Sequence, residues 1–248
     1  MDYTAFLDFV KTRRTLRAIK PDAIPEDIVD KLVEAARWAP SGFNMQPWEF
    51  VVVRDFSLRA EIKKVVDDYR ANDFFAMEAT REEWQGSPWK PTLQGEFGLP
   101  LAPVYIVLLG DTRRNVGLPM AARYTYQKMY SIFDSTLSNA FLYMVLAAHS
   151  LGLAAMYCSA TKYPKVGGLI KHILNIPHYL ELYDLLLVGK SDMKVPPKLM
   201  RDKREMIHYD KAGPNEFASE ERVREQIIKV REGNVGRHKG ADIKGAKN

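Results

Sequence analysis

Residues 39–50 read Ala39-Pro40-Ser41-Gly42-Phe43-Asn44-Met45-Gln46-Pro47-Trp48-Glu49-Phe50, and this stretch lies between a helical pattern and a strand-like run. Its two prolines fix φ and remove backbone donors, which predicts an ordered loop rather than a continuing element. The small residues allow close backbone approach, the amides donate and accept hydrogen bonds, and the tryptophan offers a flat wall. Two interpretations fit: a wall for a flat ligand with polar edges, or a plain connection whose Trp48 fills the core.

The sequence on both sides of this loop predicts helices interleaved with short buried strands. Pro25-Glu26-Asp27 opens a clear helix, because proline suits the first turn and acids suit the positive end of the helix dipole. Apolar runs predict strands at 50–53, 104–109, 155–158 and 185–189, and periodic or continuous apolar patterns predict helices at 3–13, 58–70 and 131–151. This alternation predicts a layered α/β or α+β fold.

Composition excludes several classes of protein. The 248 residues are 46% hydrophobic and 27% charged, as in ordinary globular proteins, and the net charge of +5 is modest. One cysteine, Cys158, excludes an intramolecular disulfide framework and a multi-cysteine zinc site. We find neither a run of about 18 uninterrupted apolar residues nor a secretory signal pattern, so we expect a cytoplasmic protein without a membrane partner.

Common catalytic and cofactor motifs are missing. The chain contains no Gly-x-Gly-x-x-Gly after a strand, no His-Glu-x-x-His and no Gly-x-Ser-x-Gly. Gly189-Lys190-Ser191 imitates the end of a phosphate loop, but Asp184 stands where the first glycine of that loop is needed. The five histidines show no metal-ligand spacing, and His149 in the apolar helix is interpreted as a satisfied core residue.

Two basic stretches and one aromatic stretch remain to be interpreted. The run 13–17 offers planar guanidinium groups and a hydroxyl that suit a phosphate, although a solvated helix end has the same composition. The glycine-rich basic tail from Gly233 is typical of a flexible segment, and we expect no nucleic-acid partner. Residues 71–100 combine aromatic side chains with glycines and prolines, which fits either a lid over a site or an insertion packed on its own domain.

The order of these features resembles the FMN-dependent nitroreductase family. The resemblance rests on five blocks between residues 10 and 210. They are Arg13-Arg14-Thr15-Leu16-Arg17, Ala39 to Phe50, Leu151-Gly152-Leu153 before a strand, Leu174-Asn175-Ile176-Pro177, and Met200-Arg201-Asp202-Lys203-Arg204-Glu205 before His208-Tyr209.

This resemblance implies a three-layer α+β fold, with a mostly antiparallel central sheet between helices, in a homodimer with two interface FMN sites. It implies an NAD(P)H oxidoreductase that reduces nitroaromatic, quinone-like or other conjugated acceptors. Hydride would pass from NADH or NADPH to FMN and then to the small-molecule acceptor in a ping-pong cycle. The family chemistry resides in the flavin, so no catalytic side chain and no metal is expected.

The resemblance also carries over residue by residue. The FMN phosphate would be held by Arg13, Arg14, Thr15, Arg17 and Arg201. The isoalloxazine would meet Pro40, Ser41, Gly42, Asn44 and Gln46 of the other subunit. The loop Ser159-Ala160 would donate a hydrogen bond to flavin N5 and stabilise the charge that develops there on reduction.

Two departures from compact family members leave alternatives open. The aromatic segment 71–100 resembles the lid of the iodotyrosine deiodinase branch, and the Ser159 hydroxyl either favours one-electron steps, as in a reductive dehalogenase, or merely caps the strand end. A non-catalytic flavin-binding protein is a third alternative, whereas Thr15 argues against the flavin-fragmenting branch, which has Asp there. The candidates for contacting substrate or forming the lid are Tyr69, Trp84, Trp89, Lys90 and Tyr126. We expect one domain over 1–213, with the candidate lid inserted at 71–100, and a basic extension over 214–248.

Overall fold

The computed structural model describes residues 2–74, 80, 98–194, 198–211, 213 and 217–230. The chain forms two compact units, Met1–Tyr69 with Gly98–Val195, and Arg70–Phe97 with Pro196–Asn248. The first unit contains the sheet. The boundary expected at residue 213 stays a prediction, and Trp84, Trp89 and Lys90 of the predicted lid lie outside the described residues.

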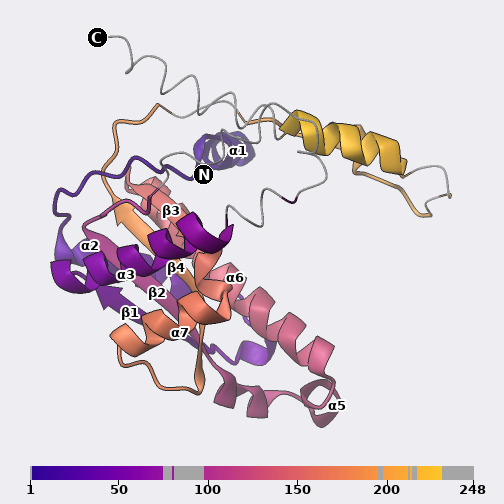
Figure 1. The fold of residues 1–248 in the computed structure, drawn as a ribbon. Coiled ribbons are helices and arrows are strands. Elements are labelled where there is room, and N and C mark those ends of the chain that lie inside the picture. Colours follow the sequence, from indigo (N-terminus) through magenta and orange to yellow (C-terminus); the bar gives the residue numbers. More distant parts are fainter. Residues whose placement is uncertain are drawn as a thin grey trace, which may run out of the picture. The chain divides into compact units, whose positions relative to one another are not determined.

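The first unit is built on a four-stranded antiparallel sheet in the order β1-β2-β4-β3 (Figure 1). The strands are β1 (Trp48–Val53), β2 (Val104–Asp111), β3 (Ala154–Cys158) and β4 (Leu180–Gly189). All four predicted strands are present. β4 begins five residues before the predicted start at Leu185, because its first half, Leu180 to Asp184, alternates apolar and polar residues and does not form an apolar run.

Helices cover both faces of this sheet. They are α1 (Tyr3–Thr12), α2 (Glu26–Arg37), α3 (Phe56–Tyr69), α5 (Met120–Arg123), α6 (Tyr126–Ser150) and α7 (Pro164–Ile173). α2 and α6 bury Leu32, Phe141 and Met144 against Ile106 and Leu108 of β2. Every residue of β2 is buried, so both of its faces are covered, and α3 and α7 pack on each other (Figure 1). The expected α+β fold with an antiparallel sheet flanked by helices is confirmed.

The long apolar helix α6 starts five residues earlier than the predicted start at Ser131. Its first turn mixes Tyr126 and Tyr130 with the polar Gln127 and Lys128, which interrupts the continuous apolar pattern. The helix ends as expected at Gly152, whose φ is +70°, and the Leu153 amide donates to the Ala148 carbonyl at 2.9 Å. By length and composition alone α6 would be able to cross a membrane, and 44% of its most apolar window is buried inside the protein.

β4 contains a bulge opposite the middle of β2. Asp184 pairs with Leu108 and Leu182 pairs with Leu109, so Tyr183 is an extra residue with no partner on β2. In a bulge of this kind two successive residues of one strand oppose one residue of the other. Tyr183 and Asp184 are thus the two residues of the bulge. Tyr183 packs in the core together with residues of α6.

The second unit is described only in part. A turn of 3-10 helix, Lys203–Glu205, precedes a helical stretch over 220–230. The Arg222 guanidinium pairs with Glu205 at 2.9 Å, the Gln226 amide donates to the same carboxylate at 2.5 Å, and the rings of His208 and Phe217 lie 4.7 Å apart. Within this unit Arg201 donates to the Glu205 carbonyl at 3.4 Å.

Candidate functional site

The loop that precedes β1 has an unusual backbone. It contains a 3-10 turn, Gly42–Asn44, and three of its residues other than glycine have positive φ: Phe43 at 53°, Asn44 at 54° and Gln46 at 46°. Positive φ places Cβ too close to the backbone and costs about 1–2 kcal/mol for each residue. Such strain persists only where the surrounding structure holds it, and it concentrates at functional sites.

Hydrogen bonds hold the strained loop from within and from α6. The Gly42 amide donates to the Thr136 hydroxyl at 3.1 Å, and the Asn139 side chain donates to the Pro40 carbonyl at 3.1 Å. A side chain at Gly42 would collide with Ile132 of α6, so only glycine fits at that contact.

Inside the loop, the Gln46 amide donates to the Ser41 hydroxyl at 3.3 Å, and the Gln46 side chain donates to Asn44 Oδ1 at 3.0 Å. Trp48 is buried in the core, which confirms the core role that was one of the two interpretations for it. The loop beside it keeps its predicted residues together: Pro40, Ser41, Gly42, Asn44 and Gln46.

The basic run follows α1 and lies along the edge strand β3. Thr15 forms a parallel bridge with Ala155, and the Leu16 amide donates to the Ala155 carbonyl at 3.2 Å. Arg13 is partly buried, and burial together with the neighbouring Arg14 charge lowers its pKa. Within the described residues Arg13 has no ion pair with an acid. A partly buried cation of this kind favours an anionic ligand, which is the chemistry expected of a phosphate site.

The loop before β1 and the turn after β3 lie at the same end of the sheet. Trp48 opens β1 opposite Gly110, Asp111 pairs with Leu180, and Cys158 ends β3 opposite Leu185. β1 and β3 are the two edge strands, so this end of the sheet carries one predicted flavin-contacting segment at each edge.

The turn that contains Ser159 and Ala160 is a 3-10 turn, Ser159–Lys162. Its buried Thr161 donates to the Cys158 carbonyl at 3.1 Å, and the helix α7 backs it at Gly167, where an added Cβ would lie 2.5 Å from the Thr161 carbonyl oxygen. Amides at the start of such a turn lack partners inside it and are available as donors.

Beneath this turn lies a residue that the sequence did not single out as functional. Asp184 is 1% exposed, and its Oδ1 accepts a hydrogen bond from Thr161 at 3.3 Å. Burial raises the pKa of Asp184 to about 6, against the opposing influence of Tyr157, Lys162 and Thr161. The available signal was an acidic residue directly before the apolar run 185–188.

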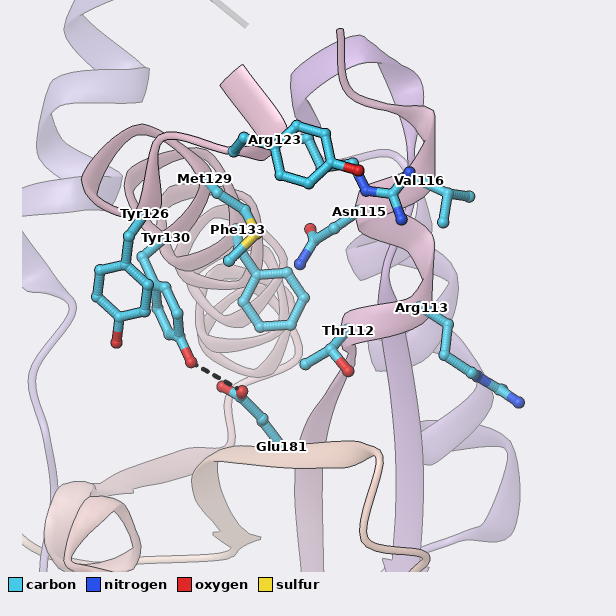
Figure 2. A pocket seen from close by; sticks show the side chains of 11 residues that line it. Thr112, Arg113, Asn115, Val116, Arg123, Tyr126, Met129, Tyr130, Phe133 and Glu181 are labelled. Carbon is cyan, nitrogen blue, oxygen red and sulfur yellow. Dashed lines mark hydrogen bonds between the residues drawn. The ribbon is translucent and has the colours of Figure 1, made fainter. Parts of the chain in front are cut away.

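A hollow of about 440 Å³ opens between the first turns of α6 and the 3-10 turn Thr112–Gly117 (Figure 2). Met129, Tyr130 and Phe133 of α6 form its apolar side, and Asn115 faces them from the opposite side (Figure 2). The Tyr130 hydroxyl donates to Glu181 at 3.0 Å, and Asn115 Oδ1 is buried with no hydrogen-bond partner in the part of the chain that the structure describes. The hollow therefore offers mainly aromatic and apolar surface.

The remaining residues named in the sequence analysis lie in different parts of the structure. Tyr126 is 64% exposed and its ring lies 4.4 Å from that of Tyr130 at this hollow, whereas Tyr69 is buried with its ring 4.7 Å from Tyr163. His149 is partly buried and bonds to the Thr12 hydroxyl at 3.0 Å and the Phe9 carbonyl at 3.2 Å, as expected of a satisfied histidine.

Arg201 belongs to the second unit, so its predicted role beside Arg13 stays a prediction. Among the described residues no group of metal-ligating side chains occurs.

Comparison with known proteins identifies the family. The chain belongs to the Nitroreductase family, whose model matches residues 10–190, and it is an oxidoreductase of that family. It is 26% identical over 211 residues to an iodotyrosine deiodinase of Danio rerio, a match that covers 82% of this chain and spans only 66% of that protein. It is 29% identical over 202 residues to an iodotyrosine deiodinase of Haliscomenobacter hydrossis, covering 79% of this chain and 84% of the relative.

The fold is also shared with solved structures. The structure of an FMN-dependent nitroreductase from Clostridium difficile superimposes with a TM-score of 0.58 at 21% identity, covering 83% of this chain and 99% of that one. The antiparallel sheet flanked by helices is therefore the nitroreductase fold.

Proposed function

We propose that this protein is an FMN-dependent NAD(P)H oxidoreductase that reduces nitroaromatic, quinone-like or other conjugated acceptors in a ping-pong cycle. The observation that carries the proposal is Arg13, a partly buried cation with its pKa lowered and no acid paired to it among the described residues, beside Thr15 on the sheet edge. A phosphate monoester supplies the dianion that this arrangement favours.

In this proposal the chain holds and orients the flavin. Arg13, Arg14, Thr15 and Arg17 would bind the phosphate, together with Arg201. When bound, FMN accepts a hydride from the nicotinamide and passes it to the acceptor. The strained loop from Pro40 to Gln46 would present Ser41, Gly42 and Asn44 to the ring, and the amides of Ser159 and Ala160 would donate hydrogen bonds where charge develops.

We further propose that the protein is a homodimer with an FMN site at each end of the interface. Support comes from the surface: α1 buries no residue in the chain itself, and Trp38 and Phe43 are 78% and 63% exposed. Apolar exposure of this extent is typical of surfaces that associate. A second copy of the chain would cover it.

The first test is flavin content and reduction. We expect the purified protein to carry FMN and the bound FMN to be bleached anaerobically by NADH or NADPH. The double variant Arg13→Ala/Arg17→Ala is expected to weaken FMN binding at least 10-fold, whereas Arg37→Ala, which removes an exposed arginine paired with Glu34, should leave it unchanged. Purified protein that binds no FMN would refute the proposal.

A second candidate function is reductive dehalogenation through one-electron steps. It is favoured by the match to two proteins named iodotyrosine deiodinase and by the Ser159 hydroxyl at the turn. Stopped-flow reduction in the presence of a halogenated phenol distinguishes the two. Two separate one-electron phases support dehalogenation, and a single two-electron phase supports the main proposal. Absence of turnover with every acceptor of a nitroaromatic, quinone and halophenol panel would instead indicate a non-catalytic flavin-binding protein.

A further inference from the structure

The carboxyl of Asp184 is buried in the core and incompletely satisfied. The residue is 1% exposed, Oδ1 has one hydrogen bond from Thr161, and Oδ2 is buried with no partner among the residues that the structure describes. Buried carboxyl groups are normally paired or fully hydrogen-bonded, because desolvation of the charge costs several kcal/mol. The proposed function assigns no role to this group.

A short chain of contacts joins Asp184 to the turn that carries Ser159. The Thr161 hydroxyl lies 3.1 Å from the Cys158 carbonyl oxygen and 3.3 Å from Asp184 Oδ1. A hydroxyl has one hydrogen, so Thr161 donates fully to only one of these two oxygens at a time. The Cys158 carbonyl and the Ser159 amide belong to the same planar peptide group. A hydrogen bond to that carbonyl therefore polarises the peptide and makes the Ser159 amide a stronger donor.

We propose that Asp184 is a positioning residue whose protonation state sets, through Thr161, how strongly the Ser159 amide donates a hydrogen bond. The ionised carboxylate attracts the Thr161 hydrogen and withdraws it from the Cys158 carbonyl. The protonated carboxyl leaves that hydrogen with the carbonyl. Low pH thus strengthens the Ser159 donor and high pH weakens it.

The groups that face Asp184 come from each element around it. Lys162 of the turn lies 3.5 Å from Asp134 of α6 and 4.0 Å from the ring centre of Tyr183 on β4. The Tyr157 hydroxyl of β3 faces the carboxyl and is the strongest of the influences that lower the pKa of Asp184, although its geometry does not make it a hydrogen-bond partner of Oδ2. The pKa of Asp184 is raised to about 6, and burial is the largest cause of this increase. Tyr157, Lys162 and Thr161 act to lower the pKa, whereas the charge of Asp134 raises it further. The Asp184 carboxyl therefore changes its protonation state near pH 6.

The consequence for a bound flavin rests on the proposed function. The nicotinamide hydride brings two electrons and one proton to the cofactor. The proton that Asp184 binds comes from solvent and returns there on reoxidation, so only an O–H bond at Asp184 forms and breaks. Because a stronger donor stabilises the charge that reduction adds, the midpoint potential of FMN should fall more steeply with rising pH when Asp184 is present.

The first experiment needs no flavin. Nuclear magnetic resonance of the full chain after removal of flavin follows the Ser159 amide and the Asp184 carboxyl from about pH 4.5 to 8. In the native protein we expect both signals to change with one midpoint. Thr161→Val should uncouple the amide from the carboxyl, Thr161→Ser should restore the coupling, and Asp184→Asn should abolish the amide change. A Ser159 amide that titrates unchanged in Asp184→Asn or in Thr161→Val would overturn the inference.

Asp134→Asn is the matched control, because it removes the neighbouring carboxylate but not the Thr161 contact. It should keep the coupling and lower its midpoint, since Asp134 contributes to the raised pKa of Asp184.

The second experiment measures the midpoint potential of bound FMN against pH. Asp184→Asn and Thr161→Val should lose the additional pH dependence, and Thr161→Ser should retain it. Equal slopes in all four proteins would contradict the inference. If the native chain binds no FMN, the proposed function fails, whereas the titration of the Ser159 amide still decides the inference.

Discussion

The loop from Pro40 to Gln46 and the turn Ser159–Lys162 flank the same end of the sheet, yet different forces hold them. Neutral hydrogen bonds with Thr136 and Asn139 of α6, and one from the Gln46 side chain to Asn44, hold the loop in its strained backbone conformation. The turn depends on the Thr161 hydroxyl, which it shares with a buried carboxyl whose pKa is about 6. If the two segments form the walls of the proposed flavin site, we expect the loop to keep its structure across neutral pH and the turn to respond to protonation of Asp184.

Asp184→Asn tests this contrast with the largest expected effect. The folded state raises the pKa of Asp184 from 3.8 to about 6, so the folded protein binds more protons than the unfolded chain between these values. Its stability therefore falls as pH rises through this window, by about 3 kcal/mol in total. The neutral amide should remove that cost, so the variant should be more stable than the native protein by about 2–3 kcal/mol at pH 8 and close to it at pH 4. Urea unfolding at both pH values measures this.

The control is Asp134→Asn on the exposed side of the same cluster, where an ion pair with Lys162 contributes little. It should change stability by less than about 1 kcal/mol. Unfolding free energies of Asp184→Asn and the native protein that keep a constant difference from pH 4 to 8 would contradict the assignment.

The next largest effect on stability is expected where α7 packs against the turn Ser159–Lys162. Gly167→Ala places a methyl group 2.5 Å from the Thr161 carbonyl oxygen, whereas Gly168→Ala, one residue further along α7, meets nothing within 4 Å. We expect the first change to cost about 2 kcal/mol and to disturb the Ser159 amide signal. The second should stabilise α7 by up to about 1 kcal/mol. Thermal unfolding of the two variants side by side checks the prediction, and equal melting temperatures would show that the turn is free to move.

For the loop, the corresponding test is Thr136→Val, which removes the hydroxyl that accepts the hydrogen bond from the Gly42 amide. Valine has nearly the same shape as threonine, and the Thr136 side chain is 1% exposed. An unsatisfied, partly buried amide costs about 1–2 kcal/mol, and this cost should be the same at pH 5 and pH 8. Asn139→Ala, which removes a solvent-exposed hydrogen bond to the Pro40 carbonyl, should cost less than about 0.5 kcal/mol. A pH-dependent loss in Thr136→Val would break the comparison between loop and turn.

The smallest effect concerns strain at Phe43, whose φ is 53° and whose side chain is 63% exposed. Phe43→Gly relieves the strain but adds freedom to the unfolded chain, whereas Phe43→Ala keeps the strain. We expect the glycine variant to be more stable than the alanine variant by about 1 kcal/mol and to bind FMN more weakly, because glycine makes the loop more flexible. Paired denaturation curves and FMN titrations give both quantities.

Sequence patterns predicted the layers of the fold because apolar periodicity reports burial. They predicted all four strands of the described residues and the glycine that ends α6. The first half of β4 and the first turn of α6 were missed because polar residues interrupt the apolar run there. The loop and the basic run were predicted as site residues from motifs. Asp184 was not, because its burial by α6 and the turn Ser159–Lys162 depends on contacts between residues far apart in the chain.

The bulge at Tyr183 also divides β4 into two halves, and the pairing register with β2 shifts by one residue between them. Leu185 to Val188 pair with both β2 and β3, whereas Leu180 to Leu182 and Asp184 pair only with β2. Deletion of Tyr183 would join Leu182 to Asp184 with each keeping its present partner on β2. A one-residue deletion at this position would therefore leave the register of both halves unchanged, and its cost would be the loss of the Tyr183 side chain from the core.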